Sequence, residues 1–391
     1  MQSLELLKTR FGPPTNHRDW FKVTTTAAAL VVTSVALGSI LSTPPKPLKQ
    51  QPFPDAQEYA DAAHQLVSGN GYVTYIHNGE PEPPRYPPGF SLALAPFAAI
   101  GNYPANVQMG TKIYAAGYLL ITVVTAWLLG GSLAGALAAL LIGVSPFART
   151  YAALVMSDAF AAAGTIVLLL LLQRLSSTRV SVGGFLAGAL VVVRFPMVIN
   201  IIALLIALPS KFRLRLVVFA LPAFVALGLF QWSTFGSPLK TGYDYWVTGI
   251  RNFDPTYALK SLLVEGPWIT ADALGGRLMQ WVCPCPVGGP QAALPSIVYY
   301  PAVLIGLFWL FAPPFITLLG LGYVWKHRRE AAPGFAFCLS ILSLIFYTVY
   351  FYQGARFIAA PATLLAVYAS VVLAHWIGKI VNPHEWQKKE G

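Results

Sequence analysis

Two carboxylates and several aromatic hydroxyls lie in the stretch that follows the first long apolar run of the chain. Asp55 and Glu58 are three residues apart, and the rigid turn Arg85-Tyr86-Pro87-Pro88-Gly89 comes later in the same stretch. A carboxylate at a lipid surface with a raised pKa can take a proton from an acceptor hydroxyl. We therefore predict that Asp55 is the catalytic base, with N-capping of the following helix as the alternative. The predicted substrate-pocket residues are Tyr59, Arg85, Tyr86, Tyr243 and His64.

A further carboxylate stands at the start of another apolar run. Asp158 follows Ser157 and precedes a long apolar segment. We interpret Asp158, together with Glu58, as a residue that orients the acceptor or holds a divalent cation. The alternative is again that Asp158 caps the N-terminus of the following helix. Oxygen ligands suit Mg²⁺ or Mn²⁺. Two acids do not make a metal site, so the metal requirement is left open and no other cofactor is expected.

Two arginines are candidates for binding an anion. Arg194 precedes Phe195 and Pro196 inside an apolar region, and proline suits the first turn of a helix. An arginine at a helix N-terminus makes an anion site, although Arg194 could instead pair with an acid or snorkel. Arg356 stands at the start of the last apolar run. It is either a bidentate phosphate ligand or an interface anchor.

The overall composition places most of the chain in lipid. Its 391 residues are 56% hydrophobic and 10% charged, against about 25% charged in soluble domains. The net charge of +11 falls in short clusters between apolar runs, which is typical of inner membrane loops and argues against nucleic acid as a partner. Three cysteines predict no disulfide framework. Cys283 and Cys285 are interpreted as an idle thiol pair rather than a redox or metal site. The N-terminal segment does not resemble a cleavable signal.

The apolar runs predict an all-α polytopic membrane protein with about ten transmembrane helices in a single domain, 1–391. The predicted spans are 23–43, 108–129, 131–147, 152–173, 215–233, 297–323, 333–351 and 357–378, with a short half-length helix pair over 183–208. Lys and Arg place both termini in the cytoplasm. Two long segments then lie outside: the first connector (44–107) and the second connector (234–296). The stretch 56–67 of the first connector predicts an amphipathic helix on the membrane surface.

The half-length pair follows from the charge distribution. The basic clusters can all lie inside only if 183–208 crosses the membrane an even number of times. Two full helices do not fit in 26 residues at a rise of about 1.5 Å per residue. We therefore predict two short helices that turn at Arg194 in the outer half of the membrane.

Together these motifs resemble the GT-C superfamily of integral-membrane glycosyltransferases, which includes protein mannosyltransferases and aminoarabinose transferases. Asp55 matches the family's catalytic acid after the first membrane helix, and Asp158 looks like its second acidic site. The resemblance implies a polyprenyl-phosphate-linked sugar donor and a glycan, lipid or protein acceptor. It further implies inverting transfer of a hexose or pentose on the extracytoplasmic face, with Arg356 and Arg194 on the donor phosphate. Two departures are that Glu58 is not adjacent to Asp55 and that no soluble C-terminal domain is expected.

The alternative class is a multi-span transporter or lipid flippase, and a non-catalytic scaffold is a third. A conduit needs polar groups spread along its spans. Here the spans are nearly free of charge and the polar groups gather at one face, which favours a one-sided enzyme. The sequence leaves the sugar and the acceptor open.

Overall fold

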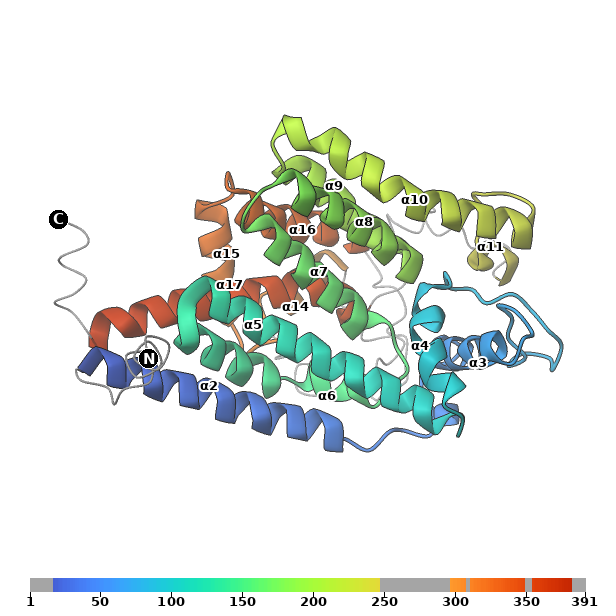
Figure 1. The fold of residues 1–391 in the computed structure, drawn as a ribbon, viewed down its shortest axis with the longest axis horizontal. Coiled ribbons are helices and arrows are strands. Elements are labelled where there is room, and N and C mark those ends of the chain that lie inside the picture. The colour runs from blue at the N-terminus through green and yellow to red at the C-terminus, as the bar shows by residue number, and fades with distance from the viewer. Residues whose placement is uncertain (1–16, 247–295, 307–309, 349–353, 382–391) are drawn as a thin grey trace, which may run out of the picture.

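The computed structural model describes residues 17–246, 296–306, 310–348 and 354–381, which form a bundle of helices (Figure 1). The longer helices are α2 (His17–Ser42), α3 (Asp55–Val67), α4 (Gly89–Ala99), α5 (Ala105–Gly143), α7 (Asp158–Leu172), α8 (Ser177–Val193), α9 (Val198–Ala207), α10 (Ser210–Phe235), α15 (Ile316–Lys326), α16 (Ala331–Thr348) and α17 (Ala359–Val381). The shorter ones are η1 (Leu48–Gln50), α6 (Pro146–Ala152), η2 (Phe195–Met197), α11 (Gly242–Trp246), α14 (Ser296–Leu304) and η4 (Ala355–Ile358).

The all-helical membrane class is confirmed, but the predicted count of about ten spans is not. Within the described residues, 5 helices are long and apolar enough to cross a membrane. They are Trp20–Ser42, Ala105–Gly143, Ser210–Phe235, Ala331–Thr348 and Ala355–Val381. Shorter apolar helices, including α4, α7 and α8, complete the bundle.

Helix α17 lies at the centre of the bundle and begins next to Arg356. Its residues are buried without a gap from Ala359 to Ser370, and it packs against α5, α15 and α7. A helix that is apolar all round lies in the core of a protein or spans a membrane, and the burial of α17 places it in the core. The position of Arg356 is therefore fixed by the most enclosed helix of the fold.

Helix α5 is a hairpin that contains two of the predicted spans. Its backbone breaks at Gly131, whose φ of 79° is a conformation that glycine adopts without penalty. The two halves then run side by side, because Gly143 lies next to Leu119 and Gly135 next to Trp127. The predicted boundary between 129 and 131 coincides with this break.

The predicted helix pair around Arg194 is present, with one member longer than expected. Helix α8 begins at Ser177 rather than 183 and has 17 residues. Arg194 has extended backbone angles (φ −153°, ψ 124°) and ends α8, and the proline-containing turn η2 follows directly. Helices α8 and α10 run in close contact, because Gly184 lies against Leu216 and Gly188 against Ala220.

Two predicted spans have wrong boundaries. The span 297–323 is interrupted, because α14 ends at Leu304 and α15 begins only at Ile316. Pro313 and Pro314 fall in the gap, and proline removes the N–H that a continuing helix needs. The span 152–173 begins at Asp158, since the first connector binds the preceding backbone: Gln51 Oε1 accepts from Val155 N at 2.7 Å. Cys283, Cys285 and most of the second connector lie outside the described residues.

Candidate active site

The first connector folds into two helices joined by the proline turn. The amphipathic helix predicted over 56–67 is confirmed as α3. The hydroxyl of Tyr72 donates to the carbonyl oxygens of Tyr86 (3.0 Å) and Pro87 (3.3 Å), which holds the turn. At the start of α4, Gly89 lies against the backbone of Val192 near the end of α8. The turn is thereby held next to the helix that leads into Arg194.

Asp55 is the first residue of α3, and its side chain does not cap that helix. The N-cap position is Pro54, which makes no side-chain hydrogen bond. Asp55 Oδ2 instead accepts from Arg356 Nη2 at 2.8 Å, and Oδ1 accepts from the Tyr86 hydroxyl. Both side chains of the ion pair are largely buried, 10% exposed for Arg356 and 16% for Asp55. The capping interpretation is therefore wrong, and Asp55 faces Arg356.

Asp158 stands in the same way at the start of α7. The N-cap Ser157 makes no side-chain cap bond, and Asp158 Oδ1 forms an ion pair with Arg194 Nη1. Asp158 is only 2% exposed, and its Oδ2 has no hydrogen-bond partner among the described residues. One alternative for Arg194, pairing with an acid, is thus what the structure shows.

The two acid–arginine pairs meet at one aromatic ring. The guanidinium of Arg356 lies 5.4 Å from the ring centre of Phe357, and that of Arg194 lies 5.6 Å from the same ring. Tyr59 joins them, with its hydroxyl 3.3 Å from Ser157 Oγ and its ring 4.8 Å from that of Tyr86. The structure therefore brings together Asp55, Asp158, Arg194 and Arg356, with Tyr59 and Tyr86 beside them.

The tyrosines in this cluster act as neutral hydroxyls. Burial raises the pKa of Tyr59 and the pKa of Tyr86 well above the ordinary value for tyrosine. The nearby Asp55 carboxylate raises the pKa of Tyr86 further. A protonated phenol is a hydrogen-bond donor. Tyr86 can therefore hold the Asp55 carboxylate in place without adding charge.

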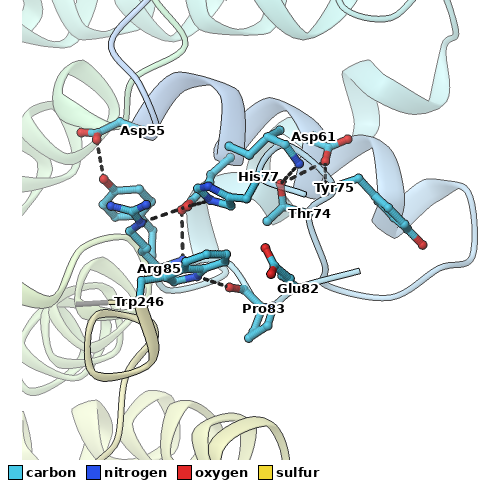
Figure 2. Close-up of polar contacts among 12 residues, drawn as sticks. Asp55, Asp61, Thr74, Tyr75, His77, Glu82, Pro83, Arg85 and Trp246 are labelled. Atoms are coloured by element: carbon cyan, nitrogen blue, oxygen red, sulfur yellow. Dashed lines mark hydrogen bonds and ion pairs between the residues drawn. The ribbon is translucent and has the colours of Figure 1, made fainter. Parts of the chain in front are cut away.

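Glu58 and Arg85 form a different cluster from the one predicted for them. The buried Glu58 carboxylate accepts from His77 Nε2 and from the Arg85 backbone, both at 3.0 Å, and pairs with Arg85 Nε at 3.2 Å. Trp246 covers this group, with its ring 3.9 Å from the ring of His77 and 5.5 Å from the Arg85 guanidinium (Figure 2). Burial raises the pKa of Glu58, and the bonds from His77 and Arg85 oppose that rise.

This second cluster fastens the two connectors together. Trp246 Nε1 donates to the carbonyl of Pro83 at 2.7 Å (Figure 2). Gly242 approaches so closely that a Cβ there would lie 2.3 Å from the carbonyl oxygen of Pro84. Neither of these two contacts between the connectors was predicted, because Trp246 and Gly242 carry no spacing signal. Glu58 and Arg85 thus support the turn that carries Tyr86.

The remaining predicted pocket residues fall on either side of this arrangement. Tyr243 meets the ring of Tyr86 edge-on at 5.6 Å, so it borders the first cluster. His64 stacks on Tyr103 at 4.4 Å. It lies nine residues along α3 from Asp55, a distance of about 13 Å. The structure therefore does not bring His64 to the acid–arginine pairs.

The described residues offer no group of three or more His, Cys, Asp or Glu side chains that could hold a metal ion. Each acid of the cluster faces an arginine, which already balances its charge. The sequence leaves a role for Mg²⁺ or Mn²⁺ open, and these contacts do not test it. The arrangement can donate from two guanidiniums to an anion and offer a carboxylate to a nearby hydroxyl.

No protein-family model and no curated protein sequence matches the chain. Its fold is similar to that of ArnT from Cupriavidus metallidurans (TM-score 0.56, 13% identity, 95% of this chain and 62% of that one). The ArnT structure bound to undecaprenyl phosphate matches with a TM-score of 0.55 at 13% identity, over 92% of this chain and 60% of that one.

A second similar structure is the archaeal oligosaccharyltransferase AglB from Archaeoglobus fulgidus, in complex with an inhibitory peptide and a dolichol-phosphate. It matches with a TM-score of 0.51 and 13% identity, over 93% of this chain and 52% of that one. The chain thus spans less than two thirds of the length of these neighbours. Both are membrane glycosyltransferases of the GT-C superfamily. The resemblance predicted from the sequence is therefore confirmed at the level of the fold, which this chain shares with GT-C glycosyltransferases.

Proposed function

We propose that the chain is a membrane glycosyltransferase that moves a sugar from a polyprenyl-phosphate donor to an acceptor hydroxyl. The observation that carries this proposal is the meeting of the Asp55–Arg356 and Asp158–Arg194 pairs on Phe357. One carboxylate and two guanidiniums in a partly enclosed place are the groups that such a reaction needs. The neighbours solved with undecaprenyl phosphate and with a dolichol-phosphate support this class of donor.

The proposed step is a single displacement at the anomeric carbon. Asp55 takes the proton of the acceptor hydroxyl, and the acceptor oxygen forms the new bond to that carbon. The bond from the anomeric carbon to the phosphate oxygen breaks, and polyprenyl phosphate leaves with the electron pair. The configuration at the anomeric carbon is inverted. Arg356 and Arg194 stabilise the negative charge of the leaving group, and such a group needs no strong acid.

The test uses purified protein with a polyprenyl-phosphate sugar and an acceptor, and measures the release of polyprenyl phosphate. Asp55→Asn keeps the size of the side chain and removes the base, so we expect a loss of about 10²- to 10⁴-fold. Glu80→Gln is the matched control, because Glu80 is an exposed acid of the same connector. Full turnover by Asp55→Asn would overturn the assignment of the base.

Arg356 is tested separately through binding of polyprenyl phosphate without a sugar. Arg356→Ala removes a charged donor, and a hydrogen bond to a charged group contributes about 1.5–3 kcal/mol, so the affinity should fall at least about tenfold. Arg149→Ala, which changes an exposed arginine of α6, is the control. Unchanged affinity in Arg356→Ala would leave Arg356 as an interface anchor.

A further inference from the structure

A basic groove lies at the opposite end of α8 from the acid–arginine pairs. Its volume is about 600 Å³, and it opens between the first turns of α8 and α10, lined by Ser177, Lys211, Phe212, Arg215 and Phe219. The 17 residues of α8 separate it from Arg194 by about 25 Å. The groove is therefore a separate place, near the other face of the membrane.

The positive charge of this groove is not balanced by neighbouring acids. The sequence contains no Asp or Glu between Asp158 and Asp244. Among the described residues, neither Lys211 nor Arg215 forms an ion pair. An acid brought to the same end by α15 and α16, Glu330, is bonded to His327 at 2.7 Å. Two unbalanced cations beside a groove favour an anionic ligand.

The two cations are held at the walls of the groove. Arg215 Nε donates to Ser181 Oγ of α8 at 2.6 Å, and the guanidinium lies 5.6 Å from the ring centre of Phe219. Lys211 Nζ lies 5.2 Å from the ring of Phe212. The bond from Nε leaves the terminal nitrogens of Arg215 without a partner among the described residues, and these are the atoms that bind phosphate bidentately.

The surface that continues from the groove is apolar. The buried residues of α10 form one narrow stripe through Leu216, Ala220 and Leu227. The other side of the helix exposes large apolar side chains, including Leu214 at 75% and Val218 at 53%. A free phosphate ion has no apolar part to contact such a surface, whereas the acyl chain of a lipid would pack along it. The combination therefore indicates a lipid as the source of the phosphate.

We propose that this groove binds an anionic phospholipid, with Lys211 and Arg215 on its phosphate and one acyl chain along α10. Basic pockets between membrane helices bind acidic lipid headgroups by the same chemistry. The proposal is independent of the sugar transfer at the other end of the molecule. Helices α8 and α10 contact each other at Gly184 and Gly188. The proposed lipid would bridge the N-terminal ends of these two helices.

The test is a titration of the delipidated full chain with phosphatidylglycerol, followed by native mass spectrometry. Phosphatidylcholine, whose zwitterionic headgroup has the same phosphate but no net charge, serves as the control. Each basic residue near an anionic headgroup contributes about fivefold to affinity, so Lys211→Gln with Arg215→Gln should weaken phosphatidylglycerol binding about 25-fold. Phosphatidylcholine binding should not change.

The matched control is Lys326→Gln with Arg329→Gln. These exposed residues lie at the same end of the molecule, because Gly334 after them contacts Ala207 at the end of α9. An equal loss in this control, or equal binding of the two lipids by wild type, would overturn the proposal. Displacement of phosphatidylglycerol by millimolar inorganic phosphate would show a free-phosphate site and would also overturn it.

Discussion

Gly89→Ala tests whether the two acid–arginine pairs are positioned by the contact between the proline turn and α8. Gly89 starts α4 directly after Tyr86-Pro87-Pro88, and a Cβ there would lie 2.6 Å from the carbonyl oxygen of Val192. Ordinary contact begins at 3.4 Å, so the turn and α8 have to separate by about 0.8 Å. The turn carries the Tyr86 hydroxyl that holds Asp55, and α8 ends at Arg194.

The expected result has two parts. Crowding of this kind destabilises a protein by about 1–3 kcal/mol, and a displacement of about 1 Å near reacting groups lowers turnover about 10²-fold. Thermal unfolding in detergent and release of polyprenyl phosphate measure the two effects. Gly117→Ala is the control, because nothing lies within 4 Å of a Cβ at that position of α5. Its free energy of unfolding should rise by about 0.5–1 kcal/mol, since alanine stabilises a helix relative to glycine. Normal stability and turnover in Gly89→Ala would refute the reasoning.

Three further predictions concern particular contacts and are tested by unfolding measurements. Burial raises the pKa of Glu58, so the folded chain binds more protons than the unfolded chain above the ordinary pKa of the residue. Wild type should therefore lose stability relative to Glu58→Gln as the pH rises from 4 to 7, and a relative gain would contradict the stated cause. Asp158→Asn and Arg194→Gln should each lower the free energy of unfolding by about 3–5 kcal/mol, and the double variant should lower it by less than the sum of the two. Strictly additive losses would show that the pair is not coupled. Gly184→Ala places a Cβ 2.4 Å from a carbonyl oxygen of α10 and should lower the free energy of unfolding by about 1–3 kcal/mol. In the control Gly183→Ala, the nearest atom lies 3.9 Å from the new Cβ, so the free energy of unfolding should not fall.

The location of four charged residues at one face could be predicted, because Asp55, Asp158 and Arg356 stand next to apolar runs and Arg194 stands at the turn of the half-length pair. Helix ends at one membrane face share a depth, so the sequence predicts the same face and depth for Asp55, Asp158, Arg194 and Arg356, but not that they meet. The pairing could not be predicted. Asp55 and Arg356 are 301 residues apart, and Asp158 and Arg194 are 36 apart. A single sequence carries no signal that joins residues over such distances.

The separation of Glu58 from the Asp55 cluster has a geometric reason. Successive residues of a helix point about 100° apart, so Tyr59 and Glu58 cannot both face the Asp55 cluster. Tyr59 turns toward Ser157, and Glu58 is left to meet His77 and Arg85. Nearness of Glu58 to Asp55 in the chain therefore does not mean nearness in the site. The helical period of α3 places Glu58 and Tyr59 on either side of Asp55, and the contacts with His77 and Arg85 hold Glu58 away from the acid–arginine pairs.

The bonds of Asp55 suggest how base and donor could be linked in the proposed reaction. Its two carboxylate oxygens each accept one hydrogen bond, from Tyr86 and from Arg356, so two of the about four lone-pair sites of the carboxylate are occupied. A phosphate group between Arg356 and Arg194 would compete with Asp55 for the Arg356 guanidinium, because phosphate and carboxylate oxygens accept from the same N–H donors. Donor binding would then remove the hydrogen bond from Arg356 to Asp55 Oδ2, which makes the carboxylate a stronger base when a sugar is present to receive the nucleophile. Tyr86, which stays protonated because burial raises its pKa, would keep the carboxylate in place while Arg356 moves.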